Sequence, residues 1–105
     1  AGLGYVGLAV DMYGGGAIGA DKAECTALMT PMMSDRAILQ ARIGAAADAV
    51  RSQPESADEP VAAIGFCFGG LCVLDLARSR QDVAGVVSLH GLLLPADTFF
   101  GITLI

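Results

Sequence analysis

Three short apolar runs divide the chain, and each has the length and composition of a buried β-strand. They cover residues 5–10, 61–66 and 83–89. Turn-forming residues follow the first run, where Asp11 precedes three consecutive glycines. The pattern therefore predicts three strands that end in turns or helices.

Between these runs, apolar residues recur at helical spacing in a segment that begins at Ser34 and ends before Pro54. Ser34 is a candidate N-cap. Arg51 lies in the last predicted turn, where a positive charge interacts favourably with the helix dipole. Residues 69–78 predict a second, more apolar helix, whereas residues 17–33 lack a clean period and predict a loop with one helical turn. The spaced apolar positions of the first helix are Leu39, Ile43, Ala46 and Val50.

The order strand, helix, strand, helix, strand predicts an α/β fold with a parallel sheet of three or four strands and flanking helices. A chain of 105 residues is long enough for one small domain. A hydrophobic fraction of 54% fits elements that are buried on both faces. We therefore expect one domain that spans residues 1–105.

Charge and cysteine content narrow the classes of function that the chain can have. The net charge is −5 and the six Lys and Arg residues are scattered, so nothing predicts a nucleic-acid surface. The longest uncharged apolar stretch, residues 61–74, is too short for a membrane span. Three cysteines without a CxxC pair indicate neither a disulfide framework nor a zinc site, which favours a cytoplasmic, reducing location.

The sequence GFCFGG at residues 65–70 lies where the second predicted strand turns into the second predicted helix. It has the spacing of a nucleophile elbow with Cys67 in place of serine. Small residues two positions before and after the nucleophile, Gly65 and Gly69, let strand and helix approach closely. The positive end of the helix favours a thiolate, and the backbone N–H of Phe68 is a candidate oxyanion donor.

This segment, together with GYVGLAVDMYG upstream and VAGVVSLHG downstream, resembles the dienelactone hydrolase family of α/β-hydrolases. The similarity covers roughly residues 3–95. It implies cofactor-free hydrolysis of a small ester or lactone, in which Cys67 attacks the carbonyl and water releases the acid. The family's acid and base follow the nucleophile in the chain, and neither the strand that carries the acid nor the loop that carries the histidine is visible after residue 95. The resemblance therefore implies a truncated core domain with weak activity or none.

Several other residues have two interpretations each. His90 follows the third predicted strand, so it is a candidate base beside Cys67, although the family's histidine lies elsewhere. Cys72 is expected in the core, and Asp11 is expected to hydrogen-bond its own turn. Asp75 is expected on a helix surface.

Two rival functions remain open. In the first, the chain is a non-catalytic module whose sheet edges and apolar tail pair with a second copy to form a homodimer. In the second, the GxGxxG patterns at residues 2–7 and 14–19 bind a dinucleotide. The first pattern lacks a preceding strand. The second is not followed by a strand at the distance that a dinucleotide-binding fingerprint needs. Because the chain contains 14 glycines, chance matches to this pattern are expected.

Overall fold

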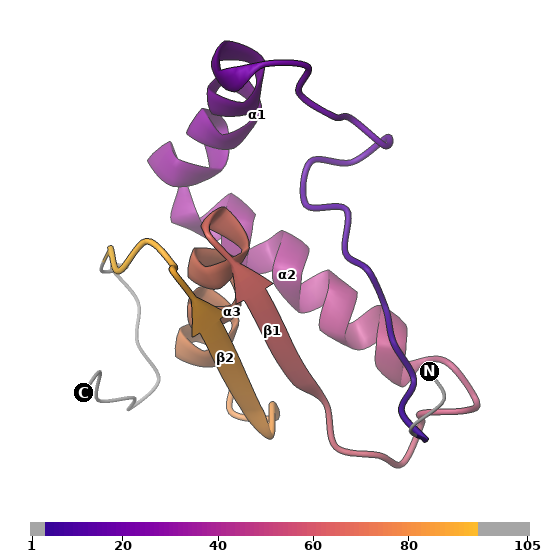
Figure 1. The fold of residues 1–105 in the computed structure, drawn as a ribbon. Coiled ribbons are helices and arrows are strands. Elements are labelled where there is room, and N and C mark those ends of the chain that lie inside the picture. Colours follow the sequence, from indigo (N-terminus) through magenta and orange to yellow (C-terminus); the bar gives the residue numbers. More distant parts are fainter. Residues whose placement is uncertain (1–3, 95–105) are drawn as a thin grey trace.

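The structure is a computed structural model in which residues 4–94 are described. Within that range the chain forms three helices and two strands, arranged as helix, helix, strand, helix, strand (Figure 1). These elements are α1 (Lys22–Ser34), α2 (Arg36–Arg51), β1 (Ala62–Phe66), α3 (Phe68–Ser79) and β2 (Gly85–Leu89).

The two strands are parallel neighbours joined by α3, as the sequence predicts for residues 61–66 and 83–89. Their register runs from Ala62 opposite Gly85 to Phe66 opposite Leu89. Both strands therefore end together, and the residues that follow them emerge at the same edge of the sheet.

The prediction of a strand at residues 5–10 is wrong. This segment has no regular structure, and its apolar side chains are exposed, from 73% for Tyr5 to 42% for Val10. A strand requires a neighbour to accept its backbone hydrogen bonds, and the described residues place none beside it. The described sheet consequently has two strands where three or four are predicted.

The helix predicted from Ser34 begins one residue later than its expected cap. Asp35 is the N-cap of α2, and its carboxylate accepts a hydrogen bond from the backbone N–H of Ala37 at 3.1 Å. Ser34 instead ends α1. The predicted end is confirmed, because Arg51 is the last helical residue and Pro54 lies beyond it.

The loop predicted for residues 17–33 is also wrong, since most of it forms α1. Asp21 caps this helix by accepting from Glu24 N at 2.9 Å, and Glu24 in turn accepts from Ala20 N. Pro31 lies inside α1 without ending it. Strong capping thus outweighs a weak apolar period.

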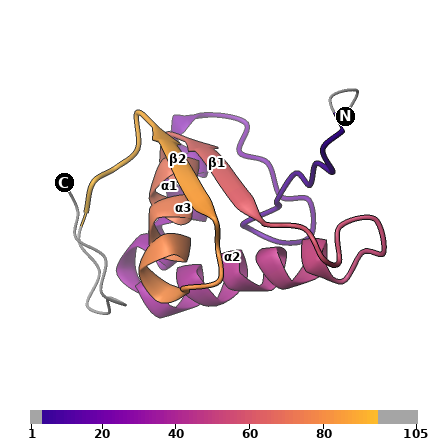
Figure 2. The same cartoon turned by 90° about the horizontal axis from the view of Figure 1, so that it is seen from below.

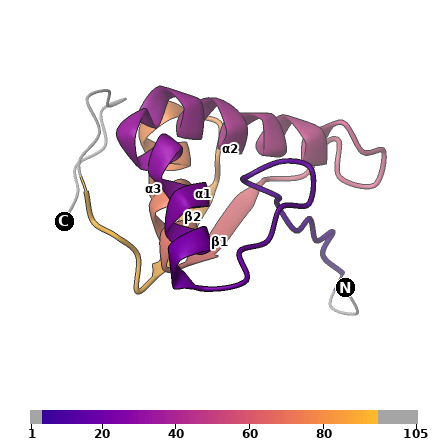
Figure 3. The ribbon, with the colours of Figure 1, turned by 90° about the horizontal axis from the view of Figure 1, so that it is seen from above.

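The core lies between α2 and α3, and α3 packs against both strands (Figures 2 and 3). The prediction that Cys72 belongs to the core is confirmed, with 1% exposure. The buried core residues are Met32, Leu39, Ile43, Ala47, Leu71, Cys72 and Leu76.

The opposite face of the sheet is apolar and open. Side chains alternate along each strand, and the set that points away from α3 is large and exposed. It consists of Ile64 at 62%, Phe66 at 61%, Val87 at 52% and Leu89 at 37% exposure. We call these four residues the open sheet face.

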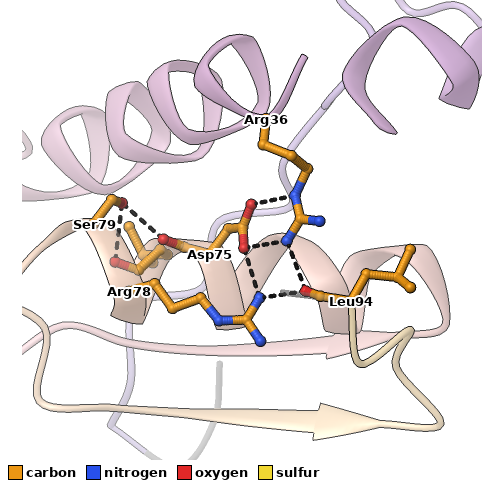
Figure 4. Close-up of polar contacts among 6 residues, drawn as sticks. Arg36, Asp75, Arg78, Ser79 and Leu94 are labelled. Carbon is orange, nitrogen blue, oxygen red and sulfur yellow. Dashed lines mark hydrogen bonds and ion pairs between the residues drawn. The ribbon is translucent and has the colours of Figure 1, made fainter. Parts of the chain in front are cut away.

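Asp75 does not lie on a helix surface as expected, because it is fully buried in α3. Its carboxylate pairs with Arg36 of α2 and with Arg78 one turn further along α3 (Figure 4). Both guanidinium groups also donate to the carbonyl oxygen of Leu94. A mid-helix aspartate is tolerated here because two cations replace its water.

Candidate active site

Cys67 occupies the turn between β1 and α3, with φ 55° and ψ −117°. This is a strained conformation for a residue with a side chain, of the kind expected at a nucleophile elbow. Its backbone N–H donates to Leu89 O at 2.9 Å, and its carbonyl accepts from Gly70 N at 3.0 Å. The thiol is exposed at the start of α3. The predicted strand–turn–helix context is therefore confirmed.

Two glycines make this tight turn possible. They are Gly65 and Gly70, whereas the motif spacing predicts Gly65 and Gly69. A Cβ on Gly65 would overlap the carbonyl of Gly69 and lie 2.8 Å from Gly70 N, so strand and helix approach as predicted. A Cβ on Gly69 would meet nothing within 4 Å. The second constrained position is Gly70, whose Cβ would lie 2.7 Å from Gly91 Cα.

His90 follows β2 as Cys67 follows β1, and these two residues come directly after the last register pair, Phe66 and Leu89. Both have positive φ, 55° for Cys67 and 41° for His90, and both are exposed. The structure thus confirms that their strands are neighbours and ends both at one edge. Within residues 4–94 the His90 imidazole makes no hydrogen bond or ion pair.

Phe68 is the first residue of α3, so its backbone N–H has no acceptor within the helix. Its ring stacks on Tyr13, with centroids 6.0 Å apart and an interplanar angle of 8°. An aromatic residue from the N-terminal segment therefore lies directly beside the elbow. Sequence reasoning did not assign Tyr13 a role, although it belongs to the DMYG segment that carries the family resemblance.

The turn at residues 11–16 holds Tyr13 in place. The Asp11 carboxylate accepts from Tyr13 N, Gly14 N and Gly16 N at 3.2, 3.0 and 2.7 Å, which confirms the predicted local role of Asp11. These bonds, led by that from Gly16, hold the pKa of Asp11 below its usual value. Arg42 of α2 donates to the Tyr13 carbonyl at 2.7 Å and fixes the turn to the helix.

The other two cysteines differ from Cys67 in setting. Burial raises the pKa of Cys72 to about 12, so this thiol stays neutral and unreactive in the folded protein. Cys25 lies exposed on α1 rather than in a loop. Among residues 4–94 no cluster of three His, Cys, Asp or Glu side chains is placed to hold a metal ion.

A hollow of about 330 Å³ lies between residues 6–8 and the C-terminal end of α2. Val6, Leu8 and Val50 contribute apolar walls, and the hollow contains neither Cys67 nor His90. Over the described residues no helix is long and apolar enough to cross a bilayer. Within the described residues, the candidate active site is therefore the turn at Cys67 and not this hollow.

Comparison with protein families decides the relationship. The model of the family described as "Dienelactone hydrolase family" matches residues 1–100. The chain belongs to this family. Dienelactone hydrolases share the α/β-hydrolase fold, so the sequence-based prediction of family and fold class is confirmed.

Solved structures agree with this assignment. The chain superposes on m3DLH with a TM-score of 0.82 and 44% identity, over 90% of this chain and 39% of that one. It superposes on a dienelactone hydrolase-like promiscuous phosphotriesterase, P91, from metagenomic libraries with a TM-score of 0.74 and 41% identity. That match covers 82% of this chain and 36% of P91.

An uncharacterized protein of Caenorhabditis elegans, K02A2.1, is 46% identical over 68 residues. The match covers 63% of this chain and 43% of the relative. The chain thus spans less than half the length of each of these three proteins.

Proposed function

We propose that Cys67 is the nucleophile of a dienelactone hydrolase-type reaction on a small ester or lactone, and that the reaction needs no cofactor. The observation that carries this proposal is the strained, exposed position of Cys67 between β1 and α3. Serine and cysteine nucleophiles use this turn because it projects the side chain above the carboxyl edge of the sheet.

The proposed reaction has two steps. The Cys67 thiolate attacks the substrate carbonyl carbon, a C–S bond forms, and the ester C–O bond breaks as the alcohol or enol leaves with a proton. The Phe68 backbone N–H donates to the developing oxyanion. Water then hydrolyses the thioester, which releases the carboxylic acid and restores the thiol.

His90 is the proposed proton acceptor for Cys67, because parallel pairing of β1 and β2 brings both residues to one edge. No acidic side chain orients the imidazole within residues 4–94. We therefore propose that the 105-residue chain forms the acyl-enzyme but turns it over slowly or not at all.

Intact-mass spectrometry after incubation with p-nitrophenyl acetate tests the nucleophile. We expect one acetyl adduct, lost in Cys67→Ala and retained in Cys25→Ala, which removes the other exposed thiol. An adduct that survives Cys67→Ala would exclude Cys67. His90→Gln should slow acetylation by roughly 10²–10⁴-fold if His90 is the base. An unchanged rate would show that His90 lines the site without accepting the proton.

The open sheet face supports a second candidate, a non-catalytic module that forms a homodimer. Four large apolar side chains lie on this face without a charged residue among them. A second copy of the chain presents the same apolar face, so it is the proposed occupant. Light scattering should show a dimer that Phe66→Lys dissociates, whereas Ile18→Lys, at an 88% exposed site elsewhere, leaves it intact. A wild-type monomer would exclude this candidate.

A further inference from the structure

A contact between two glycines joins the first turn of α3 to the segment that follows β2. A Cβ on Gly70 would lie 2.7 Å from Gly91 Cα, and a Cβ on Gly91 would lie 3.2 Å from Gly70 Cα. Neither glycine has a positive φ, so both positions require space rather than backbone freedom. The two backbones therefore touch directly, three residues after Cys67 and one residue after His90.

The segment after β2 is also fixed further along. The Leu94 carbonyl accepts from Arg36 Nη2 at 3.1 Å and from Arg78 Nη1 at 2.9 Å (Figure 4). Between this attachment and the contact between the two glycines, Leu92 packs against the core. Residues 91–94 are thus held against α2 and α3, which constrains His90 from its C-terminal side.

His90 is constrained from its N-terminal side by the turn at Cys67. The backbone N–H of Cys67 donates to Leu89 O at 2.9 Å, so the residue before His90 is bonded to the proposed nucleophile. The φ of His90 is 41°, which is unfavourable for a residue with a side chain and persists only where surrounding contacts impose it. The Leu89 hydrogen bond and the Gly91 contact supply such constraints on the two sides of His90.

We propose that Gly70 is a positioning residue, whose contact with Gly91 sets the distance between His90 and Cys67. The inference rests on the proposed function, in which His90 accepts the Cys67 proton. A side chain at position 70 would push the segment after β2 away from the first turn of α3. A misplacement of about 1 Å can slow an enzymatic reaction about 10²-fold, so this contact matters although Gly70 acts only through Gly91 and His90.

Three glycine variants test the contact. Gly70→Ala presses on it from α3, and Gly69→Ala is the matched control, because a Cβ on Gly69 would meet nothing within 4 Å. Gly91→Ala presses on the same contact from the other side, since its Cβ would overlap Ser88 Oγ and lie 3.1 Å from the Gly70 carbonyl carbon. The test therefore does not depend on the stability of Gly70→Ala alone, and urea denaturation shows which forms are folded in the assay.

The first readout is the rate at which p-nitrophenyl acetate acetylates Cys67, followed by intact mass in the Cys25→Ala background. At about pH 7 we expect Gly70→Ala to slow acetylation about 10²-fold, in the direction of His90→Gln, whereas Gly69→Ala leaves the rate unchanged. At about pH 9.5 an ordinary thiol ionises without a base, so the rates of all forms should converge. Equal rates for Gly70→Ala and Gly69→Ala would overturn the proposal. An equal loss at both pH values would also overturn it, because the damage would then lie in the turn itself.

The second readout needs no reaction. His90 is the single histidine of the chain, so its imidazole Cε1–H gives one NMR signal. We expect Cys67→Ala to shift this signal in wild type and in Gly69→Ala, but much less in Gly70→Ala. This pattern without any acetylation of wild type would refute the proposed nucleophile and still support the placement of His90 by Gly70. A signal that responds to Cys67→Ala equally in all three backgrounds, or in none, would overturn the placement.

Discussion

The two ends of α3 differ in solvent exposure and in backbone strain. At its start, Cys67 is exposed, has a strained backbone and makes no side-chain hydrogen bond among the described residues. Further along, Asp75 and Arg78 are fully buried and joined by a short ion pair. The helix is fixed by the buried residues that follow its first turn, from Gly70 to Arg78, which allows the turn at Cys67 to hold an unfavourable conformation. The exposed, strained turn and the buried ionic cluster are thus separated along one element.

Removing the charge of Asp75 should have the largest effect on stability. Asp75→Asn leaves Arg36 and Arg78 without their shared carboxylate, and breaking a buried ion pair in this way costs about 3–5 kcal/mol of unfolding free energy. Urea denaturation measures the loss. Asp82→Asn is the matched control, since Asp82 also pairs with arginine but is half exposed, and its loss should be far smaller. Equal losses would contradict the division of α3 into two ends.

Gly65→Ala tests the strained end. The added Cβ would overlap the Gly69 carbonyl, so β1 and α3 must separate at an expected cost of about 1–3 kcal/mol. Acetylation of Cys67 should fall at the same time because the elbow opens. Gly69→Ala adds the same methyl group into free space and should be neutral or stabilising. Urea denaturation and the rate of Cys67 acetylation, measured for both variants, test whether β1 and α3 must approach closely at Gly65.

The sequence predicted the parts of this fold that depend on local chemistry. Apolar runs located β1 and β2 within two residues, and the GFCFGG spacing located the turn at Cys67. The segment at residues 5–10 is equally apolar but forms no strand, because pairing depends on a neighbour rather than on composition. Local pattern therefore identifies a candidate strand without establishing that it is paired.

The missed features have long-range partners. Asp75 contacts Arg36 across 39 positions, and Tyr13 stacks on Phe68 across an even longer separation. An aspartate three residues before an arginine inside an apolar helix was the available signal for the buried cluster. The capping pair Asp21 and Glu24 was the corresponding signal for α1.

Cys67→Gly should stabilise the protein while abolishing acetylation. Glycine relieves a backbone strain of about 1–3 kcal/mol but costs roughly 0.5–1 kcal/mol in chain entropy, so the expected net gain is about 1 kcal/mol. Cys25→Gly is the same chemical change inside α1, where glycine destabilises a helix by about 1 kcal/mol. Opposite signs in thermal denaturation support strain at Cys67, and a shared loss would contradict it.

The smallest effect is expected at the Asp11 turn, which places Tyr13 against the first residue of α3. Backbone N–H groups, first that of Gly16, hold the pKa of Asp11 below its usual value of 3.8 in the folded protein. Its stabilising contribution is therefore complete above the unfolded pKa and is lost as the pH falls through the lower folded value. NMR shifts of the Gly14 and Gly16 amides should change in wild type as the pH falls below the usual aspartate pKa of 3.8. They should stay constant in Asp11→Asn, whose amide does not titrate. Shifts that follow pH equally in both proteins would show that another group controls the turn, and the Tyr13–Phe68 stack would then depend on Arg42 rather than on Asp11.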